Sequence, residues 1–215
     1  KNSVLASYAK MLDENKGLII KENTKDINYA KKIGLKENLI NRLHLNEKKI
    51  NDIRNSIISI IRFKDPINDV LEKWKRPNGL NISRVSIPIG VIGVIYESRP
   101  NVTSDVASLC FKSGNAVILR GGSEAINSNR ILSKLFRKAL KKNKVDENFI
   151  QFIDSKNRKM VDIMLSKMKE YIDEFQVFQE NEKINLNKKI NNKSLSMGQM
   201  QKISFIRALL SGLDI

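Results

Sequence analysis

Two short polar segments, each directly after an apolar run, carry the residues with the clearest chemical potential. The first, Arg120-Gly121-Gly122-Ser123-Glu124, leads into an amphipathic helical pattern. Its glycines let the backbone approach a ligand, and a helix N-terminus offers unpaired N–H groups and partial positive charge, to which Arg120 adds a full charge. The segment therefore suits a phosphate group, such as the 2′-phosphate of NADP. The alternative is a simple Gly-Gly turn with Ser123 as the N-cap, and the G-x-G-x-x-G fingerprint is absent.

The second segment, residues 97–103, begins with Glu97-Ser98-Arg99-Pro100-Asn101. Its asparagine admits two interpretations. Asn101 suits the N-cap of the following helix, because its side-chain oxygen could accept a hydrogen bond from the first turn. Alternatively, its amide could donate to an oxyanion that develops during a reaction. The residues taken alone favour the cap.

The chain has one cysteine, Cys110, and one histidine, His44. One of each can form neither a disulfide nor a metal site built from Cys and His. A Cys–His nucleophilic pair is the alternative, but the polar sequence around His44 is typical of a surface position. Cys110 shares helical spacing with Val106 and Leu109, which predicts a buried thiol with a raised pKa and poor nucleophilicity.

The formal net charge of +16 raises the question of nucleic-acid binding. The basic residues are mostly lysines spread along the whole chain, rather than arginines clustered beside aromatic residues, and this favours a solvated surface over a nucleic-acid site. No stretch reaches the roughly 18 apolar residues that a membrane span requires. No signal-peptide pattern opens the sequence, so we expect a cytoplasmic protein.

The first part of the chain is predicted to consist of helices followed by a hairpin. Apolar residues recur at helical spacing through residues 1–64, which predicts three or four helices, one of them ended by Gly34. Residues 65–88 contain two arms that alternate apolar and polar side chains around Arg-Pro-Asn-Gly at 76–79. This composition is typical of a β-hairpin with a tight turn.

Residues 89–173 alternate between apolar runs and helical patterns. The run at 91–96 is continuously apolar, which predicts a strand buried on both faces, and similar runs follow at 116–119 and 149–153. A helical pattern follows each strand, so we expect an α/β fold with a parallel sheet. Ligands bind at the carboxyl ends of such strands, and the two polar segments are predicted to form the site there.

The same segments carry a resemblance to a known family. IPIGVIGVIYESRPNVT at 87–103 and KSGNAVILRGGSEA at 112–125 resemble gamma-glutamyl phosphate reductase, also called glutamate-5-semialdehyde dehydrogenase. WKRPNGL at 74–80 and EYID at 170–173 match the same family, and the similarity runs from the first residues to about residue 173.

The resemblance implies a cofactor domain of the aldehyde-dehydrogenase type, with the hairpin as an arm for homo-oligomer formation. The implied reaction is NADPH-dependent reduction of L-glutamyl 5-phosphate to glutamate 5-semialdehyde in proline biosynthesis, through a cysteine thioester. The implied site is then assigned residue by residue. Cofactor-binding residues would be Ser98, Arg99, Pro100, Arg120, Gly121, Gly122, Ser123 and Glu124, with Asn101 in a catalytic role.

The family places its nucleophilic cysteine well downstream, in a second domain for which this sequence has no matching segment. We therefore expect residues 1–173 to correspond to the front part of such an enzyme and to retain part of the cofactor site without independent activity.

The remaining residues, 174–215, differ from the reductase family. KSLSMGQMQKISFIRALL at 193–210 resembles the signature motif and following helix of an ABC-type ATPase, although no G-x-x-x-x-G-K-[ST] loop is present. An ATP-binding fragment of an ABC transporter is therefore the alternative function. Two partial resemblances that meet near residues 174–185 suggest a joined reading frame, which a single uninterrupted frame in the source genome would disprove.

Overall fold

A computed structural model describes residues 1–174 of the chain. The predicted α/β class is confirmed, with four helices before residue 65, a hairpin, and then a parallel sheet with its helices. The elements in order are α1 (Asn2–Glu14), α2 (Lys16–Lys32), α3 (Glu37–Leu43), α4 (Glu47–Arg62), β1 (Val70–Lys75), β2 (Asn81–Val85), β3 (Val91–Ile95), α5 (Pro100–Lys112), β4 (Ala116–Arg120), the 3-10 turn η1 (Ser123–Ala125), α6 (Ile126–Lys142), the 3-10 turn η2 (Glu147–Phe149), β5 (Ile150–Phe152) and α7 (Lys159–Glu174).

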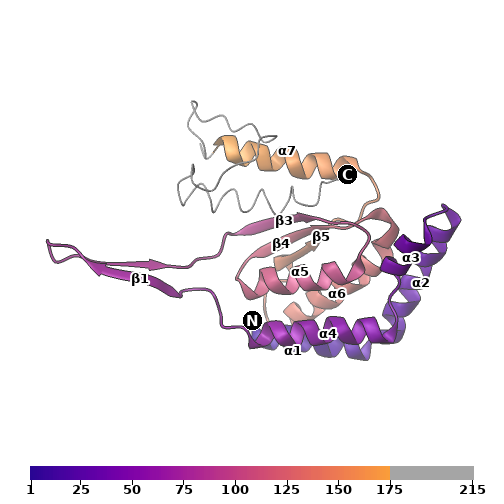
Figure 1. The fold of residues 1–215 in the computed structure, drawn as a ribbon, viewed down its shortest axis with the longest axis horizontal. Coiled ribbons are helices and arrows are strands. Elements are labelled where there is room, and N and C mark those ends of the chain that lie inside the picture. Colours follow the sequence, from indigo (N-terminus) through magenta and orange to yellow (C-terminus); the bar gives the residue numbers. More distant parts are fainter. Residues whose placement is uncertain (175–215) are drawn as a thin grey trace.

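The main sheet has the order β3-β4-β5, and both of its pairings are parallel. Helices α5 and α6 cover one face, and α7 lies over the other (Figure 1). Helices α1 and α4 form a further layer beyond α5 and α6. All carboxyl ends of the parallel strands therefore meet at one edge of the sheet, as the alternating pattern predicted.

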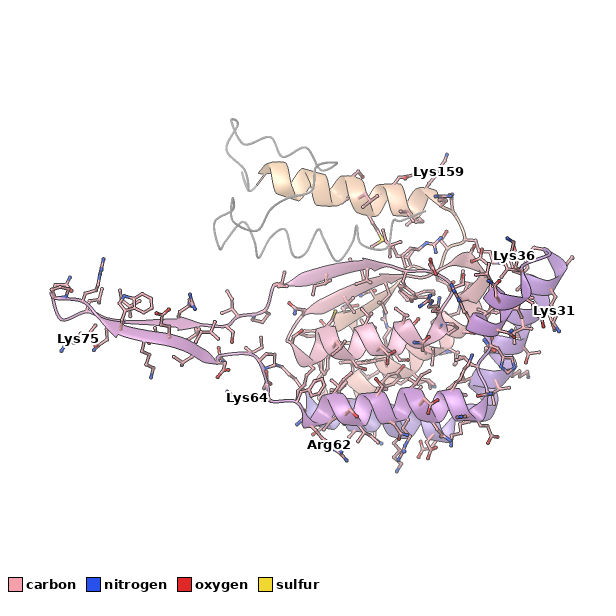
Figure 2. The ribbon with its side chains drawn as sticks, in the orientation of Figure 1. Lys31, Lys36, Arg62, Lys64, Lys75 and Lys159 are labelled. Carbon is pink, nitrogen blue, oxygen red and sulfur yellow. The ribbon has the colours of Figure 1, made fainter. Side chains whose placement is uncertain are left out.

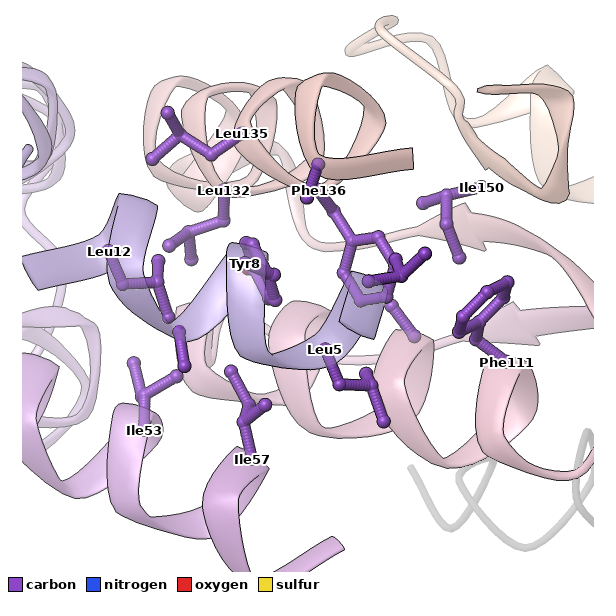
Figure 3. Close-up of a cluster of buried hydrophobic side chains, with 14 of the residues drawn as sticks. Leu5, Tyr8, Leu12, Ile53, Ile57, Phe111, Leu132, Leu135, Phe136 and Ile150 are labelled. Carbon is purple, nitrogen blue, oxygen red and sulfur yellow. The ribbon is translucent and has the colours of Figure 1, made fainter. Parts of the chain in front are cut away.

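The hydrophobic core lies between the sheet and the N-terminal helices. Helix α1 passes between α4 and α6, and Tyr8 packs against Phe136 with ring centroids 4.4 Å apart (Figure 3). Phe136 also meets Phe111 edge to face at 5.9 Å. The apolar residues predicted on one face of α6 are all buried. The N-terminal helices and the α/β part therefore share one core.

Two glycines end helices, and one of them, Gly34, was predicted to do so. Gly34 follows α2 with φ of 71°, and Gly114 follows α5 with φ of 74°, both in the left-handed region that favours glycine. At the start of α4, Asn46 is the N-cap, since its Oδ1 accepts a hydrogen bond from the backbone N–H of Lys49 at 2.9 Å.

The predicted hairpin is confirmed as an arm that projects from the body (Figure 1). Strands β1 and β2 pair antiparallel, from Lys75 with Asn81 to Val70 with Val85. All six residues of β1 are exposed, and the exposed side chains include Leu71 and Trp74.

Two expectations about burial are wrong. Strand β3 is not buried on both faces, because it lies at the sheet edge and Val91 is 57% exposed. Among the strands of residues 1–174, only β4 has a strand on each side. Leu109, expected on the inner face of its helix, is 48% exposed. The helical pattern after the third strand predicts Val161, Met164, Leu165 and Met168 on the inner face of α7. Val161, Met164 and Leu165 are half-buried, while Met168 lies outside the side chains that the structure describes.

Basic side chains are dispersed over the body and the arm. Figure 2 labels six of them, and these include Lys31 on α2, Lys75 on the arm and Lys159 at the start of α7. Across the described residues, no helix combines the length and apolar character needed to cross a membrane.

Candidate functional site

The two predicted loops lie side by side at the carboxyl ends of β3 and β4. Ile95 pairs with Arg120 in the sheet, and the backbone N–H of Tyr96 donates to the Arg120 carbonyl at 3.1 Å. Beyond this point the Oγ of Ser98 donates to Glu124 Oε2 at 2.6 Å. The structure therefore joins Ser98 and Glu124, 26 positions apart, in one site.

Neighbouring protein atoms leave no room for a side chain at Gly121 or Gly122 in the second loop. A Cβ on Gly122 would lie 2.2 Å from Ser98 Oγ, and one on Gly121 would lie 2.3 Å from Asn129 Nδ2 and 2.8 Å from the Tyr96 ring. Contacts below 3.0 Å are essentially never seen for real Cβ atoms. The glycines thus allow the two loops to touch, which is a different reason from the close approach of a ligand that the sequence suggested.

Glu124 carries the negative charge of the site. Burial works to raise the pKa of its carboxyl, but hydrogen bonds from Ser98, its own backbone N–H and Ser123, together with the charge of Arg120, hold the pKa below its ordinary value. Ser123 Oγ lies 3.0 Å from Glu124 Oε1. The carboxylate is therefore ionised at neutral pH and already oriented.

Arg120 lies behind this carboxylate and is 7% exposed. Its Nη1 donates to the carbonyl of Gly121, while its Nε is buried with no hydrogen-bond partner among residues 1–174. A buried guanidinium with an unused donor is a costly arrangement, which a ligand acceptor would relieve.

The N-terminus of α6 differs from the prediction. Ser123 is not its N-cap, because a 3-10 turn intervenes and α6 begins only at Ile126. Instead the buried carboxylate of Asp26, from α2, accepts the backbone N–H groups of Asn127 at 3.1 Å and Ser128 at 2.8 Å. These are the groups that an N-cap side chain satisfies. Asp26 therefore occupies the position that the sequence left open for a phosphate.

A buried series of hydrogen-bonded side chains packs against the Gly121 loop. It was not predicted from the sequence. The Tyr96 hydroxyl lies 2.7 Å from Thr103 Oγ1, which donates to Asn129 Oδ1 at 2.8 Å. Burial raises the pKa of the Tyr96 phenol to about 12, although its hydrogen bond to Thr103 opposes this. Asn129 Nδ2 has no partner among the described residues and lies against Gly121. Tyr96, Thr103 and Asn129 belong to three separate segments of the fold, so only the tertiary structure shows that they are linked by hydrogen bonds.

The other predicted residues lie around the start of α5. Pro100 is buried as the first residue of the helix, and the exposed Arg99 precedes it, with its Nε 3.8 Å from Glu97 Oε2. Asn101 is not an N-cap: it lies inside the first turn, and its Nδ2 donates to Asp105 Oδ2 at 3.3 Å. It lines a hollow of about 310 Å³ between α4 and α5 that the Arg120–Glu124 loop does not line.

Cys110 and His44 behave as expected. The thiol is 8% exposed, and burial raises the pKa of Cys110 to about 11, so it is a poor nucleophile. His44 is exposed at the end of α3. Within residues 1–174, no three His, Cys, Asp or Glu side chains are arranged to hold a metal ion.

A second hollow, of about 370 Å³, lies along α6 and β5. Arg130 makes two hydrogen bonds of 2.6 Å to Asp154, and Arg137 lies 3.5 Å from Glu147, while Lys134, Lys138 and Lys141 leave the lining net basic. It includes none of the predicted site residues.

Comparison with known proteins points to one enzyme. The chain is 49% identical over 166 residues to gamma-glutamyl phosphate reductase of Hydrogenobaculum sp., which covers 77% of the chain and 38% of that protein. It is 47% identical over 173 residues to the same enzyme of Clostridium tetani, covering 80% of the chain and 40% of the relative. This chain is homologous to gamma-glutamyl phosphate reductase. It spans about 40% of the length of these relatives. No family model matches it.

Solved structures agree. The gamma-glutamyl phosphate reductase of Thermotoga maritima superposes with a TM-score of 0.73 at 42% identity, over 74% of this chain and 39% of that one. The gamma-glutamyl phosphate reductase of Saccharomyces cerevisiae superposes with a TM-score of 0.68 at 30% identity, over 73% of this chain and 41% of that one. A propionaldehyde dehydrogenase of Clostridium phytofermentans superposes with a TM-score of 0.54 at 13% identity, over 76% of this chain and 34% of that one. This likeness shows that the two share an aldehyde-dehydrogenase fold.

None of these similarities bears on the ABC-type resemblance. Residues 175–215 lie outside the part of the chain that the structure describes, so the ATPase motif at 193–210 stays a sequence-based prediction. The reductase matches give no support to an ATP-binding function.

Proposed function

We propose that this chain supplies the cofactor-binding part of an NADPH-dependent reductase of L-glutamyl 5-phosphate, which forms glutamate 5-semialdehyde in proline biosynthesis. The observation that carries the proposal is the meeting of the two strand-end loops through Ser98 and Glu124, in a chain 47–49% identical to gamma-glutamyl phosphate reductases. A cytoplasmic location accords with such a biosynthetic role.

The loop residues fit a nicotinamide dinucleotide. Glu124 is an oriented carboxylate at a strand end, the kind of group that accepts hydrogen bonds from ribose hydroxyls. Arg120 retains a buried, unused Nε donor beside it, which suits an acceptor such as a phosphate oxygen. Asp26 already caps α6, and the hydroxyls of Ser98 and Ser123 already donate to Glu124, so we assign phosphate binding to Arg120 rather than to the helix N-terminus.

Bound NADPH would supply a hydride to the reacting carbonyl carbon. The contribution of this chain is to bind and orient both reactants. The exposed amide of Asn101 is available to donate to the carbonyl oxygen as negative charge develops there. Cys110 takes no part, since burial keeps it protonated.

The arm is assigned to homo-oligomer formation. Within the described part of the chain its two strands pair only with each other, and Leu71, Trp74 and Leu80 are between 41% and 58% exposed. An isolated two-stranded hairpin is marginally stable in water, and a second copy that covers these side chains would stabilise it.

Titration of the full chain with NADPH, followed by quenching of protein fluorescence, tests the cofactor site. We expect saturable binding, weakened in S98A because Glu124 loses its orienting hydrogen bond. S166A, which removes an exposed hydroxyl on α7, is the matched control and should bind as the unmodified chain does. Absence of saturation at millimolar NADPH would remove the proposal, and the same titration with NADH measures the preference for the 2′-phosphate.

A further inference from the structure

The hollow beside Asn101 has a lining of mixed charge. It lies between α4 and the N-terminal half of α5, with a volume of about 310 Å³, within the usual size range of small-ligand pockets. Two apolar side chains, Leu45 and Ile53, form its buried part. The polar lining consists of two basic residues, two acidic residues, a serine and the asparagine: Arg42, Lys49, Asp52, Asp105, Ser56 and Asn101.

Asp105 is incompletely satisfied within the protein. Its Oδ1 is buried with no hydrogen-bond partner among residues 1–174, and its Oδ2 receives a long 3.3 Å contact from Asn101. Burial raises the pKa of this carboxyl, with the neighbouring Ser56 and Asn101 side chains opposing the effect. A cation placed in the hollow would remove this cost, because an opposite charge stabilises the ionised form.

The basic side chains of the hollow do not provide that cation. Lys49 is committed to the end of α3, where its Nζ donates to the carbonyls of Asn41 and His44 at 2.8 Å each. Arg42 is exposed, and among the described residues its guanidinium makes no hydrogen bond or ion pair. The hollow therefore presents two carboxylates, those of Asp52 and Asp105, and the guanidinium of Arg42, none of which forms an ion pair among the described residues. Together they complement a ligand that carries both charges.

The spacing fits a short amino acid. Asn101 and Asp105 lie about one turn apart on α5, and their side chains meet at 3.3 Å between Nδ2 and Oδ2. The α-carbon and the side-chain carbonyl carbon of a glutamyl group are separated by three C–C bonds of about 1.5 Å each. A carbonyl held at Asn101 would thus place its α-ammonium near Asp105.

We propose that this hollow binds the α-amino-acid head of the substrate, with Asp105 receiving the ammonium group and Arg42 the carboxylate. The proposal rests on the proposed function, since it assigns the charged end of that reaction's substrate to the hollow that Asn101 lines. Pairing of the ammonium with Asp105 also releases the Asn101 amide from its long contact. The amide is then free to turn toward the carbonyl oxygen when substrate is present.

Calorimetric titration of the full 215-residue chain with three ligands tests this inference. L-Glutamate carries both charged groups, glutarate lacks the ammonium, and 4-aminobutyrate lacks the α-carboxylate. We expect L-glutamate to bind at least about tenfold more tightly than either, the effect of one charge-assisted hydrogen bond. D105N should abolish the preference over glutarate alone, and R42Q the preference over 4-aminobutyrate alone. D162N, an exposed change on α7, should leave all three affinities unchanged.

Equal binding of the three ligands, or a glutamate preference unaffected by D105N, would overturn the assignment. The ranking by the unmodified chain decides the question if D105N does not fold. Saturable NADPH binding without any glutamate preference refutes the head-group site alone and leaves the proposed function standing. A glutamate preference without NADPH binding supports the head-group site and removes the cofactor assignment instead.

Discussion

Asp26 gives the sharpest test of how the site is held in place. Its carboxylate is 1% exposed and accepts four hydrogen bonds from the first turn of α6, namely the backbone N–H and Nδ2 of Asn127 and the backbone N–H and Oγ of Ser128. We predict that D26A destabilises the whole fold and also disorders the Gly121–Glu124 loop, which leads directly into that turn.

The magnitude follows from the groups left without partners. Two backbone N–H groups at the helix N-terminus lose their acceptor, at about 1–2 kcal/mol each. The Oγ of Ser128 still accepts a hydrogen bond from Asn23 at 3.0 Å, but its O–H loses Asp26 as acceptor, which moves the loss toward the upper end of the range. The expected loss is about 2–4 kcal/mol, or a decrease in Tm of about 5–15 °C for a chain of this size.

Thermal unfolding followed by far-UV circular dichroism measures the change. D146A is the matched control, because Asp146 accepts a single backbone N–H, that of Asn148 at 2.9 Å, in an exposed turn. The free energy of unfolding of D146A should fall by less than about 1 kcal/mol. Sulfate should raise the Tm of D26A more than that of the unmodified chain, since an anion can replace the carboxylate. A Tm of D26A within the range of D146A would refute the reasoning.

Three further predictions concern the loops and the thiol. G122A should cost about 1–3 kcal/mol in urea unfolding, and less in an S98A background, because the Oγ of Ser98 is the nearest atom to the added Cβ. E124Q should lower the Tm at pH 7, and the difference should vanish as the pH falls well below 4, because the folded carboxyl has a pKa below its ordinary 4.5 and its stabilisation is lost on protonation. Iodoacetamide should modify Cys110 slowly at pH 8 and quickly in denaturant, with a rate in the folded chain that rises toward pH 11, as mass spectrometry can follow.

Local sequence patterns predicted the elements and their order well. The alternation of apolar runs with helical patterns after residue 89 predicted the parallel sheet. This is possible because the side of a strand or helix that faces the core must be apolar, so the spacing of apolar residues reports the type of element. Gly34 and the Asn-Gly turn of the arm were also readable, since left-handed or tightly turned backbone selects a few residue types. The proximity of Ser98 to Glu124 followed from one topological rule about strand ends.

The errors arose where distant segments decide the outcome. Ser123 has the chemistry of an N-cap, but the position was taken by Asp26, about a hundred residues earlier in the chain. The apolar composition of β3 could not show that the strand lies at an edge, which leaves Val91 exposed. Similarly, the glycines at 121 and 122 indicated a close approach without revealing which atoms approach.

The hydrogen bonds that Asp26 of α2 accepts from the first turn of α6 have a consequence for how this chain folds. Asp26 and Ser128 are 102 positions apart, and the helix that begins at Ile126 depends on a residue synthesised long before it. Contacts of such high sequence separation slow the search for the native state and make the folding of both segments a single cooperative event. Division of the chain at the arm would therefore produce two halves that are each unable to complete the nucleus, rather than two independent folding units.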